Sequence, residues 1–327
     1  MKYFPKKLTM TWIRNSYKEG SLTPEELAGE IVRRAEKYRD YNIWIVAPDL
    51  KRMMDYIEKL PKDMESLPLW GIPFAVKDNI DVAGSPTTAA CPDYAYDPEE
   101  DAAVVKKLIG AGAFPVGKTN LDQFATGLVG TRSPYGEVKN ALDPELISGG
   151  SSSGSAVSVA LGMAAFSLGT DTAGSGRVPA ALNCLVGYKP SLGAWSTKGV
   201  VPACASLDCV TVFANSLEDA EEVNLAARGV DEECCWSRAY KEPLPKLPKK
   251  ICLAKDGVTF YGPYADIYKA KWEQAKSGSR IWELPWNISI TRCFQRQHPF
   301  FMTDPGWQSA GKISVISWRA TREKYFR

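Results

Sequence analysis

The sequence predicts an α/β fold, because apolar strands alternate with helices along its first half. Residues 71–80, GIPFAVKDNI, form a short apolar run that ends in charge, which indicates a buried strand. Residues 101–124, DAAVVKKLIGAGAFPVGKTNLDQF, have the pattern of a helix, a glycine turn and a strand. Residues 153–171 add a helix over about 153–162 and a buried strand that ends near Asp171. We therefore expect a largely parallel or mixed sheet with helices packed on it.

An amphipathic surface helix is predicted upstream, in LTPEELAGEIVRRAEKY at residues 22–38. Thr23 is placed as the N-cap, Pro24 follows at the first helical position, and Glu26 comes three residues after the cap. This arrangement is a capping box. The apolar residues that follow recur at helical spacing, which indicates that one face of the helix is buried.

The composition is that of a globular protein with no electrostatic signature for nucleic acid. The chain has 327 residues, of which 45% are hydrophobic and 24% charged, and its formal net charge is +2. The first 15 residues lack the apolar region of a secretory signal, and no uninterrupted apolar stretch is long enough to span a bilayer. We expect a cytoplasmic protein with no nucleic-acid partner and no membrane segment.

The cysteines and the single histidine do not form a metal-binding pattern. Eight cysteines are scattered along the chain, and their spacing fits no zinc motif. We interpret them as reduced thiols, with Cys184 and Cys204 as buried small hydrophobic residues. No metal and no cofactor are expected.

Two clusters rich in glycine and serine raise the possibility of a serine nucleophile. They are GGSSSGS at 149–155 and GTDTAGSGR at 169–177. A serine needs an adjacent base, and the one histidine, His298, lies far along the chain. A lysine can serve as the base in place of histidine where burial lowers the pKa of the lysine. Lys77 lies at the carboxyl end of one predicted strand, and the second cluster lies at the carboxyl end of another. Sites gather at this end of the strands in such sheets, so Lys77 and the second cluster could converge.

Three segments, taken in order, resemble the amidase signature family. They are GIPFAVKDN at 71–79, GGSSSGSAVSVA at 149–160 and GTDTAGSGRVPAALNCLVGYKPSLG at 169–193. The resemblance covers most of residues 67–220. It implies a single amidase domain over residues 1–327, with its core at 67–220, built on a central mixed β-sheet covered by helices on both faces.

The resemblance also implies a role for each matching residue. Lys77 matches the catalytic lysine, Ser151 the bridging serine after a non-proline cis peptide, and Ser175 the acylated nucleophile. Ser175 would attack an amide carbonyl while Ser151 passes its proton to neutral Lys77. The backbone N–H groups expected to form the oxyanion hole are those of Thr172, Ala173, Gly174 and Ser175.

Other polar residues in these segments are given structural roles. Asp171 and Arg177 are expected to brace the catalytic loop through an ion pair. Ser152, Ser153 and Ser155 are interpreted as helix-start caps and packing residues.

Further segments are similar to one branch of the family, the allophanate hydrolases. They are NLDQFATGLVGTRSPYG at 120–136, AGSGRVPAALN at 173–183 and STKGVVPACASLDCVTVFA at 196–214. The resemblance implies cleavage of urea-1-carboxylate, a small anionic amide, in partnership with urea carboxylase. In that branch a tyrosine and an arginine of a YEGPWVAER-like segment hold the substrate carboxylate, and no such segment is present here.

The tail after Lys276 differs in character from the rest of the chain. Residues 281–327 contain one leucine but four of the ten tryptophans, and they show no helical or alternating period. We hypothesise that residues 277–327 are a frameshift product, because the reading frame that starts two bases into the codons of FMTDPGWQS, residues 301–309, can encode YDGPWVAER. The alternative is a divergent tail. Sequencing the gene decides between them, since the hypothesis requires a shifted frame that encodes the motif.

Two other functions stay open beside the allophanate-hydrolase interpretation. One is an amidase or esterase with a permissive pocket for small substrates. The other is a non-catalytic relative that binds partners and keeps the fold, although all three catalytic positions are intact. The oligomeric state, including a homodimer, is also left open.

Overall fold

The computed structural model describes residues 3–241, 251–252, 258–262, 264–279 and 286–287. It divides the chain into two compact units, Met1–Tyr240 and Lys241–Arg327. All residues singled out for chemistry lie in the first unit. The expectation of one domain over residues 1–327 stays a prediction.

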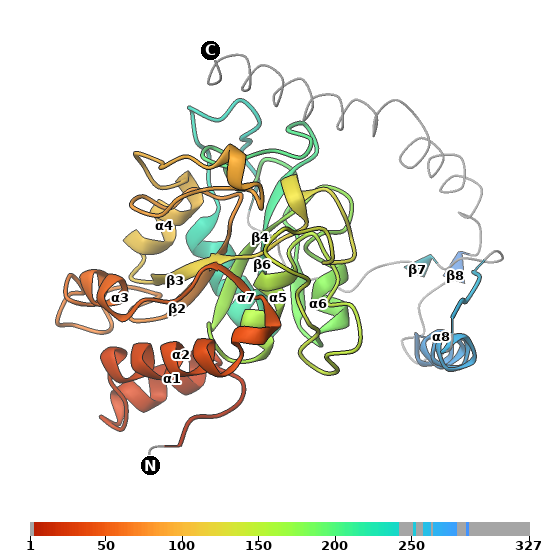
Figure 1. Ribbon diagram of the computed structural model, residues 1–327, viewed down its shortest axis with the longest axis horizontal. Coiled ribbons are helices and arrows are strands. Elements are labelled where there is room, and N and C mark those ends of the chain that lie inside the picture. Colours follow the sequence, from red (N-terminus) through yellow and green to blue (C-terminus); the bar gives the residue numbers. More distant parts are fainter. Residues whose placement is uncertain (1–2, 242–250, 253–257, 263, 280–285, 288–327) are drawn as a thin grey trace. The chain divides into compact units, whose positions relative to one another are not determined.

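The first unit is built on a six-stranded mixed sheet with the strand order β1-β3-β2-β4-β6-β5 (Figure 1). The strands are β1 (Trp44–Val46), β2 (Pro73–Lys77), β3 (Phe114–Thr119), β4 (Phe166–Asp171), β5 (Val186–Tyr188) and β6 (Cys209–Ala214). The three central strands β3, β2 and β4 are parallel, and the flanking pairs β1–β3, β4–β6 and β6–β5 are antiparallel. The carboxyl ends of β2 and β4, which carry Lys77 and Asp171, therefore lie side by side.

Helices cover both faces of this sheet. Those of the first unit are α1 (Met10–Lys18), α2 (Pro24–Lys37), α3 (Leu50–Ile57), α4 (Ala103–Gly110), α5 (Ser153–Ala160), α6 (Val178–Leu182) and α7 (Leu217–Ala227), with short 3-10 turns at Arg39–Tyr41, Pro92–Tyr94 and Gln123–Ala125. The connections β2–α4–β3 and β3–α5–β4 cross the sheet in opposite directions, so right-handed crossovers place α4 and α5 on opposite faces. α7 packs beside α4, and α5 packs across β2, β3, β4 and β6.

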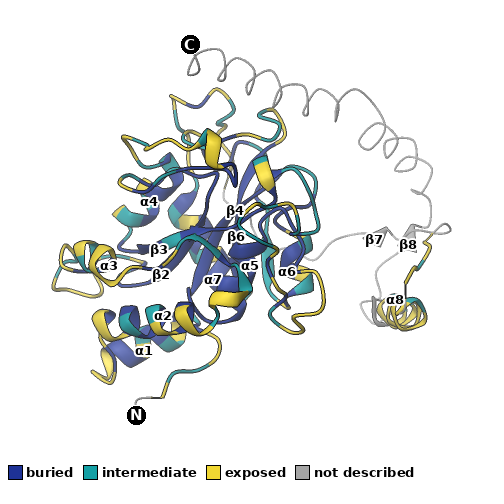
Figure 2. Cartoon of the chain, in the orientation of Figure 1, coloured by how far each residue is buried: buried dark blue, intermediate teal, exposed yellow. Residues whose placement is uncertain are grey.

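The core is the interior between the sheet and these helices, and it is continuous through β2, β4, β6 and α5 (Figure 2). Every residue of α5 is buried. Phe74 of β2 lies in register with Phe166 of β4, and the two rings stack with centroids 5.2 Å apart. Burial of this central region means that any polar group at the ends of β2 and β4 is shielded from water.

The helix and strands predicted from the sequence are present. α2 begins after Thr23, whose side chain accepts from the Glu26 amide while the Glu26 carboxylate accepts from the Thr23 amide. The predicted strand at 71–80 is β2, and the predicted units at 101–124 and 153–171 are α4–β3 and α5–β4.

The expectation that Ser152 caps α5 needs correction. Ser152 occupies the N-cap position of α5, but its side chain makes no capping bond. Its hydroxyl instead donates to the Thr170 carbonyl of β4 at 3.1 Å, and Ser155 donates to the Leu168 carbonyl at 2.9 Å. These serines tie the helix to the strand, and the Ser152 oxygen that would accept from an amide at the start of the helix accepts from the Thr170 amide at 3.3 Å instead.

The burial expected for Cys184 is also wrong. This residue follows α6 with a φ of 53°, and its side chain is exposed. The interior position is taken by Asn183, whose side-chain amide donates to the carbonyls of Ser148 and Pro179. Cys204 is half-buried rather than buried.

In the second unit the structure describes helix α8 (Ala265–Ser279) and a parallel pair of two-residue strands, β7 (Ile251–Cys252) and β8 (Trp286–Asn287). The frameshift hypothesis rests on residues 301–309, which lie outside the described residues. Sequencing the gene remains the test of the frameshift hypothesis.

Candidate active site

Lys77 is the last residue of β2 and is completely buried. Its Nζ lies 2.8 Å from Ser151 Oγ and 2.7 Å from Thr170 Oγ1. Burial lowers the pKa of this lysine to about 7, although the carboxylates of Asp122, Asp208 and Asp171 act in the opposite direction. The neutral amine is therefore well populated near neutral pH, as a general base requires.

A second buried lysine, Lys118 of β3, has different partners from Lys77. Its Nζ lies 3.0 Å from Asp78 Oδ1 in an ion pair between two buried side chains. It also donates to Thr87 Oγ1 and to the Pro86 carbonyl. By contrast, in the part of the chain that the structure describes, Lys77 makes no ion pair and contacts hydroxyl groups alone. These partners favour Lys77 over Lys118 as the base.

Ser151 is fully buried and follows a cis peptide bond from Gly150. The Ser151 carbonyl accepts from the Asp122 amide at 3.0 Å. The Asp122 carboxylate, in turn, accepts from the amides of Gly130 and Arg132. Ser151 is thus held between Lys77 and a loop that Asp122 organises.

Gly150 packs so closely that it tolerates no side chain. A Cβ there would overlap Asp122 Oδ2 and would lie 2.7 Å from the Gly130 nitrogen. We expect Gly150→Ala to lower the free energy of unfolding by about 3 kcal/mol, as overpacking a rigid interior does. Urea denaturation measures this loss.

Gly29 provides the matched control for that variant. It lies within α2 and has open space at its Cβ position. Gly29→Ala should raise the free energy of unfolding by about 0.5 to 1 kcal/mol, because alanine favours a helix interior. Equal effects of the two substitutions would contradict the packing described for Gly150.

Asp171 organises the loop that carries Ser175. Its carboxylate accepts from the amides of Gly174 and Gly176 at 2.8 and 3.0 Å. Arg177 donates to both carboxylate oxygens at 2.9 and 3.0 Å, in the ion pair expected from the sequence. The pKa of Asp171 is lowered: burial acts to raise it, and the bonds from Arg177 and the Gly176 amide prevail. The loop is therefore folded around a buried carboxylate.

This arrangement corrects one of the four predicted oxyanion donors. The Gly174 amide is occupied by Asp171 Oδ1, so it does not point to the same place as its neighbours. The amides of Thr172, Ala173 and Ser175 have no acceptor within the described residues. These three amides stay candidates for the oxyanion hole.

The Ser175 side chain is buried, and among the described residues it makes no hydrogen bond to Ser151. Its hydroxyl donates to the Gly127 carbonyl at 3.4 Å, at the long limit of a hydrogen bond. Within the described residues this is the one hydrogen bond of that hydroxyl. The structure thus brings Lys77 and Ser151 together and places Ser175 on the neighbouring loop.

Four polar residues of the site were not predicted from the sequence: Asn79, Asp122, Thr170 and Asp208. Asp208 accepts from the Thr172 hydroxyl and from the amides of Ala203 and Cys204, and so anchors the other side of the loop that carries Ser175. Asn79 and Thr170 contact each other beside Lys77. Asn79 and Asp122 lie just after the ends of β2 and β3. A polar residue directly after a predicted strand is the sequence feature that could have identified these two as site residues.

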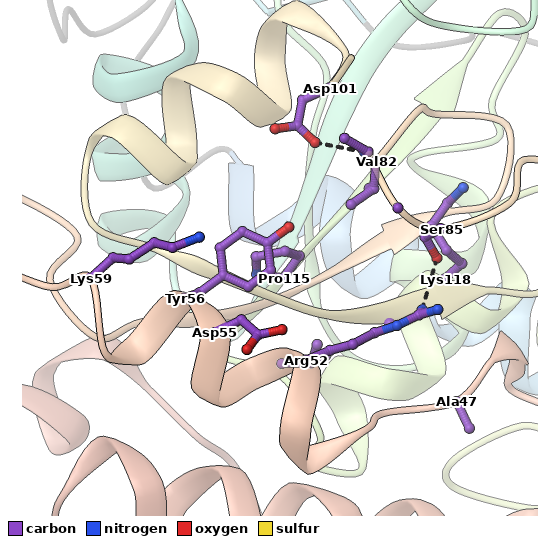
Figure 3. A pocket seen from close by; sticks show the side chains of 14 residues that line it. Ala47, Arg52, Asp55, Tyr56, Lys59, Val82, Ser85, Asp101, Pro115 and Lys118 are labelled. Carbon is purple, nitrogen blue, oxygen red and sulfur yellow. Dashed lines mark hydrogen bonds between the residues drawn. The ribbon is translucent and has the colours of Figure 1, made fainter. Parts of the chain in front are cut away.

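Two cavities lie near the site without including its three predicted catalytic residues. One, of about 470 Å³, lies between α3 and the loop after β2, and Arg52, Tyr56 and Lys118 are among its lining residues (Figure 3). The other, of about 200 Å³, reaches Asp208. Neither is lined by Lys77, Ser151 or Ser175.

The described residues contain neither a metal-binding cluster nor a membrane-spanning helix. Among them, no three His, Cys, Asp or Glu side chains gather so that they could hold a metal ion. None of the helices in that part of the chain is both long and apolar enough to cross a membrane. The absence of a metal or cofactor from the reaction stays a prediction.

Comparison with known proteins decides the family. The family described as Amidase matches residues 26–256, more than half of the chain. The chain belongs to the Amidase family. Its sheet and helices have the amidase-signature fold.

Individual proteins resemble the chain closely. Urea amidolyase of Saccharomyces cerevisiae is 47% identical over an alignment of 262 positions, which covers 77% of this chain and 14% of that protein. A structure of Kluyveromyces lactis allophanate hydrolase matches with a TM-score of 0.86 and 38% identity, over 98% of this chain and 53% of that one. The native peptide amidase of Stenotrophomonas maltophilia matches with a TM-score of 0.66 and 30% identity, over 72% of this chain and 51% of that one. The chain thus spans a small part of urea amidolyase and about half of each of the other two.

Proposed function

We propose that the chain is an amide hydrolase that acts through an acyl-enzyme on Ser175, with Ser151 as proton relay and Lys77 as base. The observation that carries this proposal is the buried Lys77 amine, held 2.8 Å from Ser151 Oγ with hydroxyl partners and a pKa of about 7. A lysine needs such an environment to act as a base at neutral pH.

In the proposed reaction the Ser175 hydroxyl leaves the Gly127 carbonyl and donates to Ser151. Ser175 Oγ attacks the substrate carbonyl, its proton passes to Ser151, and the proton of Ser151 passes to Lys77. The new oxyanion accepts from the amides of Thr172, Ala173 and Ser175. Lys77 returns the proton through Ser151 to the departing amine as the C–N bond breaks. Water, activated by the same relay, then releases the acid from Ser175.

For the substrate we propose allophanate or a similarly small amide. Support comes from the names of two similar proteins, urea amidolyase and allophanate hydrolase. The proposed partner is urea carboxylase. The proposed compartment is the cytoplasm, and the proposed assembly is a homodimer. If the frameshift hypothesis holds, the carboxylate-holding motif is lost. We then expect poor turnover of allophanate, with either residual activity on small neutral amides or esters or no activity at all.

Ammonia release tests the proposal. We expect the protein to release ammonia from allophanate or from small neutral amides such as acetamide, and a fluorophosphonate probe to form an adduct on Ser175. Comparison of the two substrates separates an allophanate hydrolase from a permissive amidase. A folded protein that releases no ammonia and forms no adduct would favour the non-catalytic relative and contradict the proposal.

A further inference from the structure

The Lys77 amine has a second hydroxyl neighbour, and the reaction above gives it no task. Thr170 Oγ1 lies 2.7 Å from Lys77 Nζ, on strand β4, which pairs with β2. Lys77 is completely buried and Thr170 is only 3% exposed. Because water has so little access, the two hydroxyls of Thr170 and Ser151 determine the orientation of the amine.

Asn79 is a second N–H donor to Thr170 Oγ1 beside Lys77. Its Nδ2 donates to the Val201 carbonyl at 3.0 Å, which identifies this atom as the amide nitrogen. The same nitrogen donates to Thr170 Oγ1 at 3.4 Å. Two N–H donors therefore converge on Thr170 Oγ1, whose two lone pairs can accept both. In this arrangement Thr170 accepts from both Lys77 and Asn79.

We propose that Thr170, held by Asn79, is a positioning residue that accepts one N–H of the neutral Lys77 amine and so directs the nitrogen lone pair at Ser151 Oγ. This inference rests on the proposed function. A neutral amine has two N–H bonds and one lone pair. One N–H goes to Thr170, and the lone pair takes the proton of Ser151 and later returns it. Thr170 itself neither gains nor loses a proton.

The proposal predicts a change in the pH dependence as well as in the rate. An acceptor beside Lys77 stabilises the charged ammonium more than the neutral amine, so its removal lowers the pKa of Lys77 further. In Thr170→Val the acid limb of the rate profile should move to lower pH by about one unit. The rate above that limb should fall about 100-fold, because the amine loses its orientation.

The test is the rate at which a fluorophosphonate probe labels Ser175, measured from pH 5 to 9 on the full chain. Thr170→Val removes the acceptor and keeps the shape of the side chain. Thr170→Ser keeps the hydroxyl and should restore the wild-type limb and most of the rate. Thr211→Val is the matched control, because the Thr211 hydroxyl is buried on the neighbouring strand β6 and makes no hydrogen bond within the described residues. It should label like the wild type.

Each outcome bears on a separate claim. A lower plateau and a shifted limb in Thr170→Val, both reversed in Thr170→Ser, support the positioning role. A lower plateau with an unmoved limb would show a merely structural role and overturn the inference, as would a Thr170→Val protein that labels like the wild type. If the wild type is not labelled at all, the proposed function fails first, and the inference fails with it.

Discussion

Ser175→Ala should reduce amide hydrolysis by roughly 10⁴- to 10⁶-fold and abolish labelling by a fluorophosphonate probe. Ser175 lies in a loop that Asp171 holds through the amides of Gly174 and Gly176. No other serine shares this loop between Asp171 and Arg177. Removal of its hydroxyl leaves the rest of the site in place but without a nucleophile. Ammonia release and the mass of the intact protein after labelling measure the two effects.

Ser153→Ala is the control for that variant. Ser153 belongs to the buried serine cluster at the start of α5, and its hydroxyl makes one long bond, 3.5 Å, to the Asn120 carbonyl. We expect this variant to keep its labelling and at least about a third of the activity, because the lost bond is weak. An adduct that persists in Ser175→Ala and disappears in Ser153→Ala would contradict the assignment of the nucleophile.

Lys77→Met should reduce hydrolysis by about 10³-fold or more, since the relay loses its base. Methionine has a similar length and no charge, so it fills the same space at the end of β2. Steady-state kinetics near pH 8 measure the loss. Lys118→Met removes the other buried lysine and leaves Asp78 without its partner. That variant should lose stability instead, so a comparison of the two separates the base from the structural ion pair.

Lys77→Met should also change how the free energy of unfolding depends on pH. The pKa of Lys77 is about 7 in the folded protein and near 10.5 in an unfolded chain. Between these values the unfolded state binds more protons, so the contribution of Lys77 to stability rises with pH. Relative to Lys77→Met, the wild type should gain about 2 kcal/mol of unfolding free energy between pH 7 and pH 9. A constant difference over this range would contradict the lowered pKa.

The main elements around the site were predictable because they are encoded locally. The apolar run before Lys77, the small residues of α5 and the apolar run that ends at Asp171 are short local patterns bounded by glycine, proline or charged residues. The capping box at Thr23 is likewise a local signal. Ser151 and Ser175 were singled out because the segments around them resemble a family. A single serine without such a segment would not have been identified as a site residue.

Contacts between distant segments explain what the sequence did not predict. Thr170 lies beside Lys77 because β2 and β4 pair in parallel, and Asp122 meets Gly130 only through the fold of a loop. The Gly174 amide turns to the Asp171 carboxylate, a choice that residue types alone do not specify. Ser152 would cap α5 in an isolated helix, but its hydroxyl oxygen accepts from the Thr170 amide of β4 instead. In each case the hydrogen-bond partner depends on which polar groups are buried away from water once the sheet has formed.

The central claim is that Lys77, as a neutral amine, activates Ser175 through Ser151. The most direct test is the pH dependence of the second-order rate at which a fluorophosphonate probe labels Ser175. We expect the rate in the wild type to rise with pH to a plateau with a midpoint near pH 7, where the pKa of Lys77 lies. In Lys77→Met this rise should disappear and the rate should be low throughout. A wild-type rate that is flat from pH 5 to 9, or unchanged in Lys77→Met, would contradict the claim.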